Sequence, residues 1–145
     1  DAKVKGAKVI AGGNARPDVG PLFYEPTVLT NVSDDMECAA TETFGPLVSI
    51  YPVADVEEPI EKANDTEYGL AAYIYTHDIR RIWKLMRALE YGMVSVNSVK
   101  MTGPPVPFGG VKQSGLGREG GATGIDEYLE TKYYCLGALG SVSGS

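Results

Sequence analysis

"GLAAYIYTHDIRRIWKLMRALEYGMVSVN", residues 69–97, has the pattern of a strand, a helix and a second strand. Its first eight residues are apolar on both alternating faces, which is typical of a strand buried on both sides. Behind a capping Asp78, apolar residues recur at three- and four-residue steps from Ile79 to Leu89 and predict an amphipathic helix. Residues 93–97 predict the second strand. The order indicates a right-handed crossover between two parallel strands.

A second unit of the same kind precedes this one. Residues 46–54 have the composition of a strand, and Asp55 and Glu58 have the spacing of a capping box, with Pro59 in the first turn of a following helix. Two strand–helix–strand units in succession predict an α/β fold with a mostly parallel open sheet and flanking helices. Ligands of such sheets bind at the carboxyl ends of the strands, so we expect a site in the loop of residues 98–110.

The rest of the chain predicts shorter elements. Residues 22–30 alternate like a strand, but Pro26 favours an edge or an irregular one. Gly92 has the position of a C-terminal cap for the preceding helix. The remaining predicted elements are a strand over 7–13, a helix over roughly 120–131 and a final strand over 132–138.

Composition excludes several classes of protein. The 145 residues allow one domain with a core, and a net charge of −6 argues against nucleic-acid binding. No apolar run reaches membrane-spanning length and no signal peptide opens the chain. Cys38 and Cys135 lack metal-ligand spacing and favour a reduced, cytoplasmic setting. The chain opens with what resembles the last turns of a helix, so we expect a piece of a longer protein.

"VPFGGVKQSGLGREGG", residues 106–121, contains the G-x-G-x-x-G spacing of a dinucleotide-binding turn. Such a turn needs a strand directly before it and an acidic residue about twenty positions later for the ribose. The stretch 111–114 is too short and polar for that strand, and no acidic residue follows Glu130. The glycines therefore predict a tightly packed turn and not a phosphate site.

Four motifs resemble the C-terminal end of aldehyde dehydrogenases, most closely the succinate-semialdehyde dehydrogenase branch. They are "ETFGPLVSIYPV" (42–53), "ANDTEYGLAAYIYTHD" (63–78), "GMVSVNS" (92–98) and "PFGGVKQSGLGREGG" followed by "GIDEYLETKYYCLGAL" (107–139). The resemblance implies that residues 1–131 are the C-terminal part of a catalytic domain and that residues 132–139 form an oligomerisation strand. Residues 140–145 have the composition of a flexible tail.

The same resemblance implies a cofactor site for NAD or NADP. The glutamate matching Glu42 bonds the hydroxyls of the nicotinamide ribose, and the phenylalanine matching Phe44 packs near the nicotinamide ring. From the sequence alone, Glu42 reads as a surface charge and Phe44 as a core residue. The choice between NAD and NADP stays open.

The aldehyde site implied by the resemblance involves Thr102 and Phe108. Succinate-semialdehyde enzymes usually carry a serine at the place of Thr102, whose hydroxyl helps to bind the distal carboxylate, so either succinate semialdehyde or another small aldehyde is expected. Phe108 would line the aldehyde channel, with plain core packing as the alternative. Glu119 matches a proton-relaying glutamate, with a structural ion pair or helix cap as the alternative.

Two functions therefore compete. In the first, the chain is part of an NAD(P)⁺-dependent aldehyde dehydrogenase, a homo-oligomer whose catalytic cysteine and general base lie upstream and without which this chain is inactive. In the second, the chain is a non-catalytic α/β module for binding or assembly. A piece of a larger domain should leave the apolar faces around Phe44 and Phe108 exposed, whereas a module should cover them.

Overall fold

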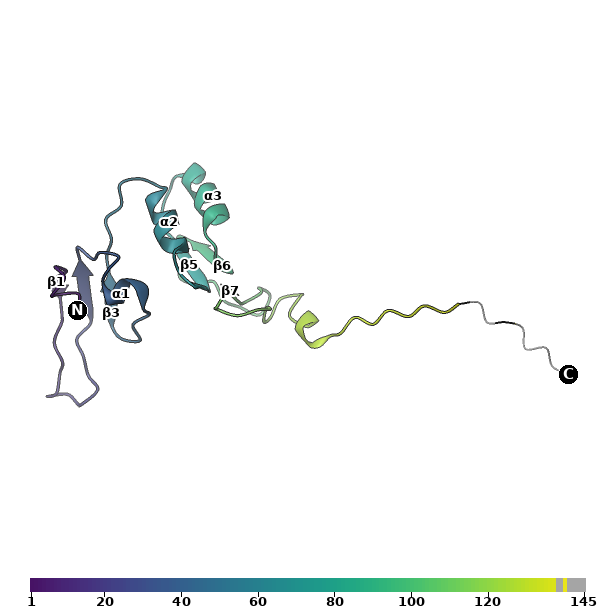
Figure 1. Cartoon of the computed structure of the whole chain (residues 1–145), viewed down its shortest axis with the longest axis horizontal. Helices are drawn as coiled ribbons and strands as arrows, with labels where there is room; N and C mark the ends of the chain where they lie inside the picture. The colour runs from purple at the N-terminus through teal and green to yellow at the C-terminus, as the bar shows by residue number, and fades with distance from the viewer. Residues whose placement is uncertain (138–139, 141–145) are drawn as a thin grey trace. The chain divides into compact units, whose positions relative to one another are not determined.

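The computed structural model describes residues 1–137 and 140, as a small mixed α/β chain (Figure 1). The chain divides into two compact units. The first unit spans Asp1–Thr66 and the second spans Glu67–Ser145. Each unit has its own short strands and helices, so each is described by itself. Among the described residues, no helix combines the length and the apolar character needed to cross a membrane.

The first unit is built on a three-stranded sheet. Its strands are β1 (Lys8–Ala11), β2 (Thr27–Thr30) and β3 (Leu47–Ser49), in the order β1-β2-β3. β1 pairs with β2 antiparallel, and β2 pairs with β3 parallel. The buried core beside this sheet consists of Ala7, Leu29, Val32 and Met36.

Of the two alternatives predicted for residues 22–30, the edge strand is wrong, because β2 is the central strand of this sheet. The irregular strand is confirmed, because only Thr27–Thr30 form β2, Tyr24 makes an isolated bridge, and the pairing of β2 with β1 shifts register. Pro26 stands immediately before β2, where its missing N–H removes no bond from the ladder. The N–H of Thr27 makes the first contact with the neighbouring segment and donates to the carbonyl of Pro46 at 2.7 Å. The proline therefore marks the start of the strand.

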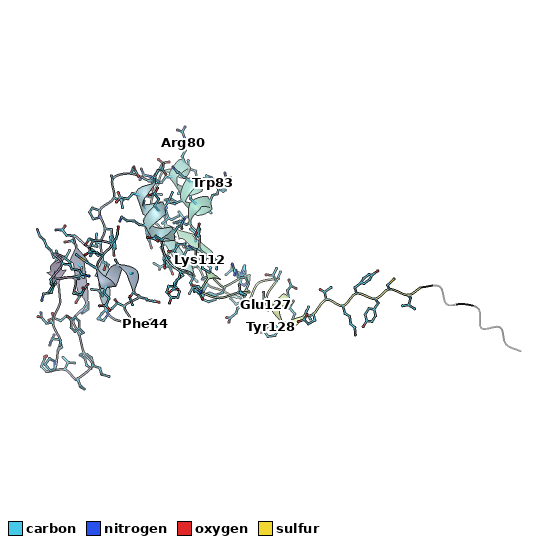
Figure 2. All side chains as sticks on the ribbon, viewed as in Figure 1. Phe44, Arg80, Trp83, Lys112, Glu127 and Tyr128 are labelled. Carbon is cyan, nitrogen blue, oxygen red and sulfur yellow. The ribbon has the colours of Figure 1, made fainter. Side chains whose placement is uncertain are left out.

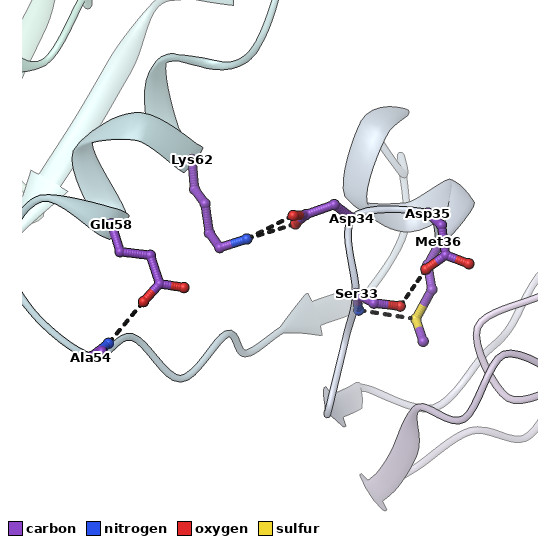
Figure 3. Close-up of polar contacts among 7 residues, drawn as sticks. All are labelled: Ser33, Asp34, Asp35, Met36, Ala54, Glu58 and Lys62. Atoms are coloured by element: carbon purple, nitrogen blue, oxygen red, sulfur yellow. Dashed lines mark hydrogen bonds and ion pairs between the residues drawn. The ribbon is translucent and has the colours of Figure 1, made fainter.

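Two short helices complete the first unit: α1 (Glu37–Ala40) and α2 (Glu58–Asn64). The predicted reciprocal capping at α2 is present, except that Glu58 bonds the N–H of Ala54 in place of that of Asp55; Figure 3 shows this Glu58–Ala54 contact. Asp55 Oδ1 accepts from the N–H of Glu58 at 3.0 Å, and Glu58 Oε2 accepts from the N–H of Ala54 at 2.8 Å.

One ion pair ties α2 to the turn before α1 (Figure 3). Lys62 Nζ lies 2.8 Å from each carboxylate oxygen of Asp34. This hydrogen bond raises the pKa of Lys62 above its ordinary value. The contact closes a loop of 28 residues within the first unit and holds α2 against the segment that leads into α1.

The second unit contains the predicted strand–helix–strand. Its elements are β4 (Tyr68–Gly69), β5 (Ala71–Ile74), α3 (Ile79–Ala88), β6 (Met93–Val96), β7 (Val111–Lys112) and a single 3₁₀ turn, η1 (Asp126–Tyr128). β5 and β6 are parallel, in register from the pair Ala71 and Met93 to the pair Ile74 and Val96. Asp78 caps α3 as predicted, because its Oδ1 accepts from the N–H groups of Arg80 and Arg81.

The prediction of one open sheet over residues 46–97 is wrong. The strands form three small sheets: β1-β2-β3, β4-β7 and β5-β6. β3 pairs with β2, a strand that lies before it in the sequence, and β4 pairs antiparallel with β7. The alternation of strands and helices therefore predicted the crossover at 69–97 correctly, but it could not predict which partner β3 would take.

Of the helix predicted over 120–131 only η1 is present, and glycine conformation excludes the first two predicted residues. Gly120 and Gly121 have φ values of 67° and 63°, in the left-handed region, and a right-handed helix cannot pass through them. In residues 132–137 the structure contains neither helix nor strand, and residues 138–139 lie outside the described part. A strand needs a neighbour for its backbone groups, so an oligomerisation strand here remains a prediction.

Gly92 does not cap α3, whose last helical residue is Ala88 and whose cap residue, Leu89, has an extended backbone. Gly92 instead allows a close approach of two backbones. A Cβ atom added to Gly92 would lie 2.1 Å from the carbonyl oxygen of Gly109 and 2.7 Å from the Cα of Gly110. The glycine thus brings the start of β6 against the end of the 98–110 loop.

Candidate functional site

Glu42 and Phe44 lie on one short loop of the first unit, residues 41–46, between α1 and β3. Two tight turns shape it: the N–H of Gly45 donates to the carbonyl of Thr43 at 2.9 Å, and the N–H of Leu47 donates to the carbonyl of Gly45 at 2.8 Å. Glu42 is exposed and Phe44 has 94% of its surface exposed (Figure 2). Phe44 is therefore not a core residue of the described chain.

Hollows flank this loop on the first unit. Phe44 lines one of about 500 Å³, together with Tyr24 and with Leu29 and other residues of the sheet strands. Glu42 lines a second, of about 300 Å³, and Thr43 borders both. The loop thus presents a carboxylate and an aromatic ring next to a concave surface. A carboxylate can accept hydrogen bonds from the hydroxyls of a ribose, and an aromatic ring can pack against a flat heteroaromatic ring.

The second candidate region is the 98–110 loop of the second unit, which carries Thr102 and ends near Phe108. Thr102 is exposed, and Phe108 has 37% of its surface exposed. The loop is tied down at its far end, because Phe108 and Glu119 exchange two backbone hydrogen bonds of 2.8 and 2.7 Å. The N–H of Gly121 also donates to the carbonyl of Pro104 at 3.0 Å. The structure therefore brings Phe108 and Glu119 together, as backbone partners.

Arg118 links different parts of the glycine-rich segment (106–121) through hydrogen bonds, a role that was not predicted from the sequence. Its Nη1 donates to the carbonyls of Gly110 and Gly117, both at 2.7 Å. Its backbone N–H donates to Glu127 Oε1 at 3.3 Å. The position of an arginine among glycines could have indicated this role, since its several N–H donors suit a turn rich in backbone carbonyls.

A pocket of about 290 Å³ lies over this segment, lined by residues that include Phe108, Arg118, Glu119 and Tyr128. Several backbone donors of this segment are already committed to partners within the second unit. The N–H groups of Gly115, Glu119 and Gly121 donate to carbonyls, and that of Arg118 donates to a carboxylate. The interpretation as a packed turn, in place of a dinucleotide-phosphate site, agrees with this bonding.

The remaining candidates are structural. Asn97 bonds the backbone of Thr76, and Lys112 Nζ lies 2.6 Å from Glu90 Oε2, both contacts that fit an architectural role. Both cysteines are free: Cys38 is half-buried against the core of the first unit and Cys135 is exposed. Within residues 1–137 and 140, no three histidine, cysteine or acidic side chains gather in a way that could hold a metal ion.

Comparison with known proteins identifies the class to which this fold and these loops belong. The model of the aldehyde dehydrogenase family matches residues 1–134. The chain therefore belongs to the aldehyde dehydrogenase family, and the resemblance read from its four motifs is confirmed.

Two of the individual relatives carry the name of a semialdehyde dehydrogenase. The chain is 72% identical over 145 residues to "Aspartate-semialdehyde dehydrogenase (Non-phosphorylating)" of Halomonas elongata, covering 100% of this chain and 29% of that protein. It is 50% identical over 139 residues to "Probable succinate-semialdehyde dehydrogenase [NADP(+)]" of Sinorhizobium fredii, covering 96% of this chain and 28% of that protein.

Among solved structures, the crystal structure of succinate-semialdehyde dehydrogenase from Burkholderia pseudomallei superposes with a TM-score of 0.88 at 53% identity. The match covers 94% of this chain and 28% of that one. The chain thus has the fold of this part of an aldehyde dehydrogenase, and it spans less than a third of the length of the relatives that it matches.

Proposed function

We propose that this chain is the C-terminal part of an NAD(P)⁺-dependent aldehyde dehydrogenase that oxidises a small semialdehyde to the carboxylic acid. The observation that carries the proposal is the 72% identity over the whole chain to a semialdehyde dehydrogenase. The geometry agrees with it, because the two candidate regions are surface loops, where binding residues most often lie.

The 41–46 loop would hold the nicotinamide riboside. Glu42 has an exposed carboxylate that can accept from two vicinal hydroxyls, and Phe44 has an exposed ring that can lie against a flat heterocycle. These residues fit the cofactor, whose bound nicotinamide supplies the acceptor for hydride. Phe44 would orient the ring and exclude water from one of its faces.

The 98–110 loop would bind the aldehyde. Aspartate and succinate semialdehydes, the substrates in the names of the two relatives, share a carboxylate remote from the aldehyde carbon. The loop carries one cation, Lys100, no acidic residue, and the exposed hydroxyl of Thr102. A hydroxyl donor and a nearby positive charge suit that carboxylate, and Phe108 would form an apolar wall beside the carbon chain.

The nucleophile and the general base would come from the part of the enzyme outside this chain. Two roles are proposed for Glu119. Its exposed carboxylate could relay a proton toward that base, or the residue could serve only to hold Phe108 through its backbone hydrogen bonds. We further propose that the enzyme is a cytoplasmic homo-oligomer. Residues 132–139 would pair with a neighbouring subunit, residues 1–131 would belong to the catalytic domain, and 140–145 would be a tail.

The alternative, a stand-alone binding or assembly module, has less support. A module should cover its own apolar surface, yet Phe44 is 94% exposed and Phe108 is 37% exposed. The residues Ile79, Trp83 and Met86, which belong to the predicted amphipathic stripe of α3, are exposed as well. Exposed apolar surface of this extent indicates a partner, which the rest of the enzyme would supply.

Replacing Glu42 tests the cofactor site. In the full-length enzyme, Glu42→Gln should raise the KM for NAD(P)⁺ and lower kcat/KM by about 10- to 100-fold, because one charged acceptor of two hydroxyl bonds is lost. Steady-state kinetics with varied cofactor measures this. Glu61→Gln, on the exposed surface of α2, is the matched control, and equal cofactor KM values in the two variants would contradict the assignment.

Replacing Thr102 tests the substrate class. Thr102→Val keeps the shape and removes the hydroxyl, so KM should rise about 10-fold for succinate and aspartate semialdehydes and stay level for pentanal, which has no carboxylate. Thr123→Val, at an exposed threonine outside the loop, is the control. A parallel loss for pentanal would mean that Thr102 does not read the carboxylate.

A further inference from the structure

The junction between β6 and the 98–110 loop is closed by the side chain of Asn97. Its Oδ1 accepts from the N–H of Thr76 at 2.9 Å, and its Nδ2 donates to the carbonyl of the same residue at 2.9 Å. Its own N–H donates to the carbonyl of Ile74 at 2.7 Å. The side-chain amide therefore takes the place of one more residue in the β5–β6 ladder and locks the carboxyl ends of the two strands together.

The backbone of Asn97 turns the chain out of the sheet at the same point. Its φ is 53°, in the left-handed region, which asparagine adopts more readily than most side chains do. A strand cannot continue through that conformation. Asn97 therefore ends β6 and sets the direction in which the loop leaves, while its amide keeps that direction tied to β5.

A second set of contacts continues from β6 into the loop. Ser95 is 8% exposed, and its Oγ donates to the carbonyl of Ser98 at 2.7 Å. Ser98 Oγ in turn accepts from the N–H of Lys100 at 3.1 Å. A connected series of hydrogen bonds thus runs from a buried strand residue to a point two residues before Thr102.

We infer that Asn97 and Ser95 are positioning residues, which hold the 98–110 loop so that Thr102 meets the substrate carboxylate. The inference rests on the proposed function of that loop. Thr102 is exposed and lies in a segment without helix or strand, so its orientation depends on how the loop is anchored. A ligand binds only the fraction of molecules in which the loop has the binding conformation. Weaker anchoring lowers that fraction, so aldehyde affinity should fall by the same factor.

Asn97→Gly in the full-length enzyme isolates the side-chain contribution, because glycine adopts the same φ without strain and removes only the amide. The KM for succinate semialdehyde should rise about 10-fold, while kcat and the KM for NAD(P)⁺ change by less than about 2-fold. Asn31→Gly is the matched control. Asn31 has nearly the same φ, 56°, and directly follows β2 in the first unit, so its replacement should leave all three constants unchanged.

Ser95→Ala gives an independent test that leaves the backbone conformation of Asn97 untouched, and it should also raise the aldehyde KM selectively. Amide hydrogen exchange of the same enzymes reports loop order without turnover. Faster exchange in residues 98–102 together with the KM change supports the inference. Unchanged aldehyde KM in both variants, or equal rises in aldehyde and cofactor KM, overturns it while the proposed function stands. A wild-type enzyme that oxidises neither semialdehyde overturns both.

Discussion

The purified 145-residue chain is expected to produce no NAD(P)H from any small aldehyde, and activity should appear when the upstream part of the enzyme is added. The physical reason is that the proposed nucleophile and general base lie outside this chain. Cys38 lines the same hollow as Glu42, but the proposed mechanism assigns it no catalytic role. Cys38 is half-buried against the core of the first unit, and Cys135 lies in the segment after η1. Absorbance at 340 nm, with succinate or aspartate semialdehyde as substrate, measures the result.

The control for this experiment is the same chain with Cys38→Ser and Cys135→Ser. Aldehyde-dependent reduction by the unmodified chain that disappears in the double variant would contradict the proposed division of the active site. Reduction that persists in the double variant would come from a contaminating enzyme.

Gly92→Ala is expected to destabilise the enzyme by roughly 3 kcal/mol, at the upper end of the usual cost of overpacking. The added methyl group would lie 2.1 Å from the carbonyl oxygen of Gly109, a backbone atom that cannot move aside by changing a rotamer. Gly92 also donates its N–H to the carbonyl of Gly69 at 3.0 Å, so a shift of its backbone would disturb that contact too. The midpoint of thermal unfolding and the soluble yield measure the loss.

Gly103→Ala is the matched control for stability. A methyl group there would meet only Pro105 Cδ at 3.8 Å, an ordinary van der Waals distance, so the midpoint should move little. If both alanine variants melt together with the wild type, the close approach of Gly92 to Gly109 does not exist in solution. If both lose stability equally, the effect comes from glycine replacement in general and not from that contact.

Several features were predictable because they depend on neighbours in the sequence. The helix α3 follows from apolar spacing between Ile79 and Leu89, and its start follows from one capping carboxylate at Asp78. The parallel pairing of β5 with β6 follows from the helix between them, since parallel strands need such a crossover connection. Glu42 and Phe44 came from a resemblance between motifs, and the structure adds that both lie exposed on one loop.

Other features could not be predicted because they join residues that are remote in the sequence. The pairing of β3 with β2 depends on which backbone edge is free after folding. The same holds for Arg118, whose Nη1 finds the carbonyl of Gly110 eight residues away. The start of the helix expected over 120–131 failed for a related reason, since the left-handed φ of Gly120 and Gly121 goes with the packing of this turn beside Pro104 and Pro107.

The sequence by itself determined the family of this protein, the crossover of residues 69–97 and the residue types available at the proposed sites. These depend on local spacing and on motifs, which a linear chain carries directly. Only the tertiary structure decided the grouping of strands into three sheets, the role of Gly92 and the bonding of Asn97 to Thr76. Those features depend on atoms that are far apart in the sequence and close in space. Gly92 and Gly109 are separated by 17 positions, and Thr76 and Asn97 by 21. No periodicity in the sequence predicts contacts between residues so far apart along the chain.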